Sequence, residues 1–103
     1  MQLTGFHTIL KGLLLSVLLY VAACETAPPV QEMSDARQAI AVAREAGAAE
    51  HAAFHLKAAE DYLESAQQAL NDRHYSEARR DAKQAKMKAL DALEASETSE
   101  EDN

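Results

Sequence analysis

The sequence predicts an all-α protein, in which a three-helix bundle over residues 32–95 follows an apolar N-terminal segment and a flexible tether. Alanine, the residue with the highest helix propensity, supplies 20 of the 80 residues from Cys24 onward. Gly47, Pro28 and Pro29 are the only glycine and prolines in that stretch. Apolar residues recur there at spacings of three and four, the period of a helix with one buried face.

The N-terminal segment has the order of a secretory signal peptide. Lys11 precedes an apolar run that extends from Leu13 to Ala23, and Cys24 follows it. The run covers about 11 residues, whereas a helix needs about 20 to cross the hydrocarbon core of a bilayer. The run is therefore too short for a permanent membrane span. Without a role for the cysteine, the segment would be an ordinary signal peptide or an N-terminal hydrophobic helix with an incidental cysteine.

The end of this run, Val21-Ala22-Ala23-Cys24, resembles the lipobox of bacterial lipoproteins, in which an aliphatic and two small residues precede a cysteine. The resemblance implies that the Cys24 thiol receives diacylglycerol, that cleavage occurs between Ala23 and Cys24, and that the new amine takes an N-acyl chain. It predicts a signal peptide over residues 1–23 and a lipidated cysteine with a tether over residues 24–31. Glu25 stands where an aspartate often signals inner-membrane retention, which favours the outer membrane and a periplasmic position.

The composition of the chain after Cys24 limits the classes of partner that the protein is expected to bind. This part keeps all 17 acidic residues and nine of the ten basic ones, so it lacks the basic footprint of a nucleic-acid-binding protein. Cys24 is the only cysteine, and its lipidation leaves no thiol for a disulfide. A small domain with an alanine-rich core buries little area, so an envelope protein partner or self-association is expected to supply further burial.

The first helix is predicted from Val30 or Ser34 to Ala46, after the tether at Pro28-Pro29. Ser34 is a candidate N-cap, and Gly47 fits the left-handed residue that closes a helix. The apolar stripe of this helix consists of Met33, Ala36, Ile40 and Ala43.

The second and third helices are predicted over residues 52–70 and 75–95. Residues 71–74 break the pattern between them, with Asn71 suited to the left-handed conformation and Asp72 able to cap the next helix. Residues 96–103 carry four acids and no apolar anchor, so they are expected to form an acidic disordered tail. The two stripes comprise Ala52, Leu56, Ala59, Leu63, Ala66 and Leu70 in the second helix, and Ala78, Ala82, Ala85, Ala89 and Ala92 in the third.

Two resemblances follow from these helices. The run from Ser34 to Ile40, then Ala46-Gly47-Ala48 and the later stripes, is similar to the domain of unknown function 4398 family of small alanine-rich bacterial lipoproteins, over about residues 33–93. Tyr75-Ser76-Glu77-Ala78 resembles the start of the second helix of a tetratricopeptide repeat. The resemblances imply a lipoprotein with a helical hairpin of tetratricopeptide-like packing.

The third helix carries the one concentration of basic residues. Arg79, Arg80, Lys83 and Lys86 form a candidate anion site for lipid phosphates or an anionic envelope polymer. The alternative is a solvated basic face opposite the acids Glu60, Asp61 and Glu64 of the second helix, with contacts that contribute roughly 0–1 kcal/mol each.

Other candidate sites find less support in the sequence. His51 and His55 have a spacing that can hold a metal, but they lack the glutamate of the H-E-x-x-H motif, so no metal site is predicted. Phe54, Tyr62 and Tyr75 are expected in core or groove packing. The serines lack a nucleophile elbow, so the chain is not expected to be an enzyme.

These observations predict a bacterial envelope lipoprotein, held at the membrane by its lipids and without a further cofactor. Its helical domain would be a non-catalytic structural or adaptor element for another envelope component. Two alternatives remain. One is a peptidoglycan-associated alanine-zipper coiled coil, and the other is a ligand- or metal-binding module that uses His51 and His55.

Overall fold

The computed structural model describes residues 2–25 and 27–102, with side chains described over residues 5–16 and 27–102. Within these residues the chain forms helices and no strand, which confirms the all-α prediction. The helices are α1 (Gln2–Glu25), α2 (Val30–Glu45), α3 (Ala48–His51), α4 (Ala53–Asn71) and α5 (Tyr75–Glu101).

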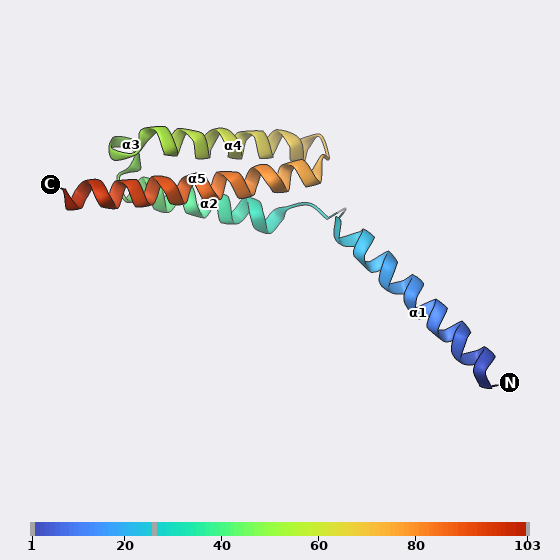
Figure 1. The fold of residues 1–103 in the computed structure, drawn as a ribbon. Coiled ribbons are helices and arrows are strands. Elements are labelled where there is room, and N and C mark those ends of the chain that lie inside the picture. The colour runs from blue at the N-terminus through green and yellow to red at the C-terminus, as the bar shows by residue number, and fades with distance from the viewer. Residues whose placement is uncertain (1, 26, 103) are drawn as a thin grey trace.

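Helices α2, α4 and α5 lie side by side, and each packs against the other two (Figure 1). We call the packed residues 30–101 the helical body. Figure 1 shows that α1 extends away from this body, beyond the segment that precedes α2. The chain reverses direction between α2 and α4 and again between α4 and α5, so residues 30–101 do not form one continuous helix.

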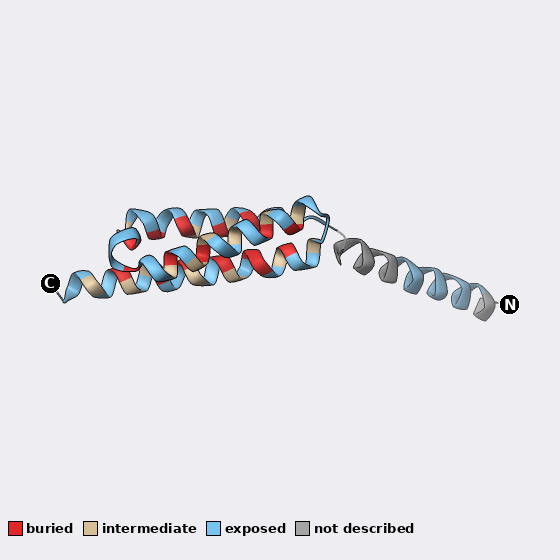
Figure 2. Ribbon diagram, turned by 90° about the horizontal axis from the view of Figure 1, so that it is seen from above, coloured by how far each residue is buried: buried red, intermediate tan, exposed pale blue. Residues whose placement is uncertain are grey.

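The core of the helical body is made mostly of alanine. Figure 2 shows the buried residues along the faces where α2, α4 and α5 meet. The predicted stripes of α2 and α5 are fully buried, whereas Leu63 and Leu70 of the α4 stripe are half-buried. Among the described residues, Pro29, Met33, Ile40 and Leu56 are the only buried apolar side chains larger than alanine. Small side chains permit close approach of the helix axes but bury little area each.

The first turn is made at Gly47, as predicted. Its φ of 87° lies in the left-handed region that glycine adopts without steric cost. The Gly47 N–H donates to the Arg44 carbonyl at 3.0 Å. The Gly47 carbonyl then accepts from the N–H groups of Glu50 and His51, which forms the short helix α3. The sequence did not predict α3, because its four residues are too few to show a periodicity.

The second turn differs from the prediction in detail. The left-handed residue is Arg73, with a φ of 63°, and not Asn71, which is the last residue of α4. The N-cap of α5 is His74 without a side-chain cap, so the prediction that Asp72 caps this helix is wrong. The N–H of His74 donates to the Ala69 carbonyl at 2.8 Å, and that of Arg73 donates to Leu70. These bonds satisfy carbonyls at the end of α4, which explains why the reversal comes two residues after Asn71.

Helix α2 begins at Val30, the earlier of the two predicted starts. Ser34 lies inside the helix and exposed, so its predicted N-cap role is wrong. The Met33 N–H donates to the Pro29 carbonyl at 3.0 Å, and the Pro29 side chain is buried against the body. Val30 and Gln31, predicted as tether, therefore belong to α2.

Helix α5 continues to Glu101, contrary to the prediction of a disordered tail from Ser96. Ser96 is fully buried, and its hydroxyl donates to the Ala92 carbonyl at 2.8 Å. The Thr98 hydroxyl donates to the Glu94 carbonyl at 2.8 Å in the same way. Ser96 thus extends the alanine stripe by one turn, because a small hydroxyl satisfied by its own helix can replace alanine at a buried position.

Candidate functional site

The four basic residues of the candidate anion site do not act as one group. Arg79 turns toward α2, where its Nε donates to Glu32 Oε1 at 3.2 Å, and its Nη2 donates to the Ala27 carbonyl at 3.0 Å. Arg80 Nε lies 3.7 Å from Asp81 Oδ1. Lys83 and Lys86 are exposed, and Lys86 borders a shallow groove between α2 and α5. Only Arg80, Lys83 and Lys86 are therefore left facing solvent.

The contacts of Arg79 fasten the end of the tether to the helical body. One guanidinium bridges the Glu32 carboxylate in the first turn of α2 and the backbone before the two prolines. Pro29 is buried beside this bridge. Arg79 therefore fixes the point at which the chain leaves the body toward α1.

We expect Arg79→Ala to lower the free energy of unfolding by about 1 kcal/mol, because it removes a charged hydrogen bond and leaves the Glu32 carboxylate half-buried without its partner. Arg80→Ala is the matched control, since the Arg80 side chain is 68% exposed, and it should change stability very little. Urea denaturation followed by circular dichroism measures both. Equal losses for the two variants would contradict the bridging role of Arg79.

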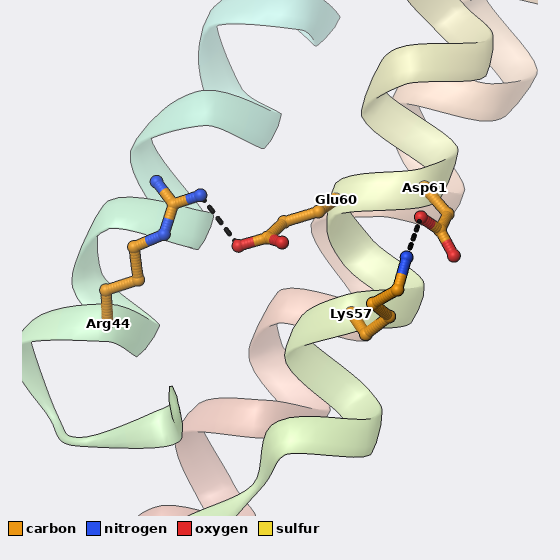
Figure 3. A network of polar contacts seen from close by, with 4 residues as sticks. All are labelled: Arg44, Lys57, Glu60 and Asp61. Carbon is orange, nitrogen blue, oxygen red and sulfur yellow. Dashed lines mark hydrogen bonds and ion pairs between the residues drawn. The ribbon is translucent and has the colours of Figure 1, made fainter. Parts of the chain in front are cut away.

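The acids of α4 pair with other partners than the sequence suggested. Glu60 Oε1 accepts from Arg44 Nη2 of α2 at 2.7 Å, and Asp61 Oδ1 accepts from Lys57 Nζ at 2.8 Å (Figure 3). The hydrogen bond and charge of Asp61 raise the pKa of Lys57 above its ordinary value of 10.5. Neither acid pairs with the basic residues of α5, so the expectation that Glu60 and Asp61 lie opposite that basic face is wrong.

A buried carboxylate joins α4 to α5. Asp81 is almost completely buried, and its Oδ2 accepts from the Ser65 hydroxyl at 2.9 Å. The sequence pattern does not predict this contact, because aspartate is rarely buried and Asp81 lies outside the alanine stripe of α5. The hydrogen bond compensates for the burial of the charge and fixes the register of the two helices.

His51 and His55 lie near the C-terminal end of α5. His51 Nδ1 is 3.4 Å from the Ser99 hydroxyl, and the His55 ring meets the Phe54 ring edge-on with centroids 5.7 Å apart. His55 lines an open cleft with Asp91, Glu94 and Asp102. Across the residues that the structure describes, no three histidine, cysteine, aspartate or glutamate side chains are grouped to hold a metal ion.

Phe54 does not pack in the core, contrary to the prediction. Its side chain is 82% exposed, Tyr62 is exposed and Tyr75 is half-buried. Phe54 lies off the face of α4 that carries the buried residues Leu56, Ala59 and Ala66, so its ring is left in solvent.

The outer face of α5 carries large apolar residues that lie outside the alanine stripe. Met87 is 57% exposed and Leu90 is 48% exposed, and Leu90 borders the groove that also exposes Val42 of α2. Their positions, off the buried stripe and between lysines and glutamates, are the sequence feature that could have identified them.

The predicted cleavage and lipidation residues, Ala23 and Cys24, have side chains outside the described residues. Among the α1 side chains that are described, the large apolar ones are exposed: Phe6, Ile9, Leu10, Leu13, Leu14 and Leu15. In the described part of the chain, no helix combines the length and the apolar character needed to cross a membrane.

Comparison with known proteins identifies one family. Neither the curated proteins nor the solved structures contain a significant match. A protein-family model described as "Domain of unknown function (DUF4398)" matches residues 31–103, which include α3 to α5 and all of α2 except its first residue. This match covers well over half of the chain. The chain therefore belongs to the DUF4398 family.

Proposed function

We propose that this protein is a bacterial envelope lipoprotein, anchored through lipids on Cys24, with a helical body that acts as a non-catalytic structural or adaptor element. The observation that carries the proposal is the run Val21-Ala22-Ala23-Cys24 at the end of a short apolar segment. One acyl chain gives only marginal membrane binding, whereas two or more give stable anchoring.

The organisation of the described residues supports this proposal. Among the described residues, the core clusters are built from residues 33–95, so removal of residues 1–23 would leave those contacts in place. The apolar side chains described in α1 are exposed, as expected of a segment whose partner is a translocation machinery or a membrane. Arg79 and Pro29 hold the chain at the body just after the proposed anchor.

We further propose that α2, α4 and α5 act as one three-helix bundle and that α4 and α5 pack as a tetratricopeptide-like hairpin. Contacts among all three helices and the small residues Ala78, Ala82 and Ala85 on the inner face of α5 support this. The periplasmic face of the outer membrane is the proposed location, and another envelope component is the proposed partner.

We expect the native protein to incorporate a fatty-acid probe and the Cys24→Ser variant to incorporate none, because the thiol is the atom that would receive diacylglycerol. The variant should also retain residues 1–23, since cleavage follows lipidation. Metabolic labelling and intact mass spectrometry of the purified products measure both effects. Cys24→Ala is a second variant that tests the same thiol. Equal labelling of native and variant proteins, or a native product that retains Met1 and has the mass of its bare polypeptide, would refute the anchor.

A further inference from the structure

The solvent-facing side of α5 has an ordered sequence of charges. Going along the helix, exposed lysines come first, exposed apolar residues follow, and exposed glutamates come last. Spacings of three and four place all of them on one face of the helix, opposite the buried alanine stripe. This face, which we call the outer α5 face, consists of Lys83, Lys86, Met87, Leu90, Glu94 and Glu97.

The helix dipole does not account for this order of charges. The dipole favours acidic residues near the N-terminus and basic residues near the C-terminus, each by about 0.3–1 kcal/mol, and its effect falls off within the first and last turns. Glu77 in the first turn agrees with this preference, whereas the last turn contains no basic residue. The lysines and glutamates of the outer α5 face lie further inside the helix, so their order gains nothing from the dipole.

The charges are symmetric about Leu90. Lys86 and Glu94 lie four residues on either side of Leu90, and Lys83 and Glu97 lie seven residues on either side. When two copies of such a helix lie antiparallel with their Leu90 residues opposed, each lysine meets a glutamate of the other copy. The same two contacts, Lys86–Glu94 and Lys83–Glu97, are each made twice, as a twofold interface requires.

The structure leaves these charges available for a partner. Within the described residues, Lys83, Lys86, Glu94 and Glu97 take part in none of the ion pairs that the helical body forms. Met87 and Leu90 are about half exposed at the centre of the face, and Leu90 borders the groove that Val42 of α2 also lines. An apolar centre between complementary charges is the usual composition of a protein interface.

We propose that the outer α5 face is the interface of a twofold, antiparallel homodimer centred on Leu90. A second copy fits this face better than an anionic lipid or polymer, because Glu94 and Glu97 would repel an extended anion from half of it. Burial of Met87 and Leu90 compensates for the small area that the alanine core buries. The proposal goes beyond the lipoprotein function and does not depend on Cys24.

Paired charge reversals test this dimer in the full chain, in detergent micelles that accommodate α1. Sedimentation and light scattering should show a dimer for the native protein. Lys83→Glu with Lys86→Glu, and separately Glu94→Lys with Glu97→Lys, should each weaken the dimer roughly tenfold or more, because every lysine–glutamate contact becomes a like-charge contact. Glu45→Lys with Glu50→Lys is the matched control, since it reverses two exposed acids on other helices and should leave the dimer intact.

An equimolar mixture of the two reversed variants gives the decisive result. One variant then presents four glutamates and the other four lysines on the outer α5 face, so the mixture should form a one-to-one heterodimer. Its recovery also shows that both variants are folded. A monomeric native protein, reversed variants that remain dimeric, or a mixture that stays monomeric would overturn the proposal. None of these results depends on lipidation, so they leave the proposed anchor to its own test.

Discussion

Replacing Ile40 with alanine is expected to lower the free energy of unfolding of the helical body by about 2–5 kcal/mol, the cost typical of truncating a buried aliphatic side chain. Ile40 is almost fully buried in a cluster whose other members are mostly alanine. Those small neighbours cannot move far into the space that is left, so the cavity persists. Because small domains have total stabilities near 5 kcal/mol, this single change should leave a large fraction of the chains unfolded at room temperature.

Urea denaturation followed by far-ultraviolet circular dichroism measures the effect of Ile40→Ala. Val30→Ala is the control, since Val30 lies on the same helix with an exposed side chain and should lose about 0.5 kcal/mol or less. Similar losses for the two variants would show that Ile40 is not the centre of the core.

The sequence predicts the buried faces of the helices well, because burial repeats with the helical period and leaves a readable stripe. Met33, Ile40 and the alanines of α5 all lie where the spacing predicts them. Gly47 is found in its left-handed conformation for an equally local reason, since no other residue type adopts it so easily. The ends of the helices are harder to predict, because Ser34 and Asp72 are good caps only if the helix begins beside them.

The candidate site is predicted less completely, because its partners come from different helices. Arg79 was grouped with its basic neighbours, yet it turns to Glu32 of α2, which is distant in sequence. Glu60 was expected opposite α5, yet it faces Arg44 across the α2–α4 contact. In a hairpin of two helices, an acid on one helix can pair only with basic residues of the other. A third helix offers a second possible partner, and the helical periodicity of the sequence does not show which of the two helices the acid faces. The rotation of each helix is set by packing and by turns such as the one at Arg73.

Phe54 shows the same limit for apolar residues. Hydrophobicity favours its burial, yet Phe54 lies off the buried face of α4 and its side chain is left in solvent. The rotation of α4 therefore decides which of its apolar residues are buried, and the spacing between the helices decides which side chains fit there. This conclusion leads to a second large effect, in which an apolar side chain destabilises the protein because it is too large.

Ala89→Leu is expected to lower the free energy of unfolding by about 1–3 kcal/mol, although leucine is the more hydrophobic residue and also a good helix former. Ala89 is completely buried in the cluster that contains Ile40, Ala43 and Ala59. A larger side chain there must push α5 away from α2 and α4, so α5 loses packing contacts with both helices. Thermal or urea denaturation measures the loss, and Ala41→Leu on the exposed side of α2 is the control that should change stability little.

Combining Ile40→Ala with Ala89→Leu tests why leucine destabilises the protein at position 89. It distinguishes a lack of space between α2 and α5 from a general intolerance of α5 to substitution. The two residues belong to one cluster of buried side chains, and the double change removes about as much volume as it adds. If the close approach of the helices is what excludes leucine at position 89, then the space vacated at position 40 should accommodate part of it. The double variant should therefore lose less stability than the sum of the single variants. A loss equal to that sum would mean that the two side chains do not share space. The destabilisation by leucine at position 89 would then not be explained by the close approach of α2 and α5.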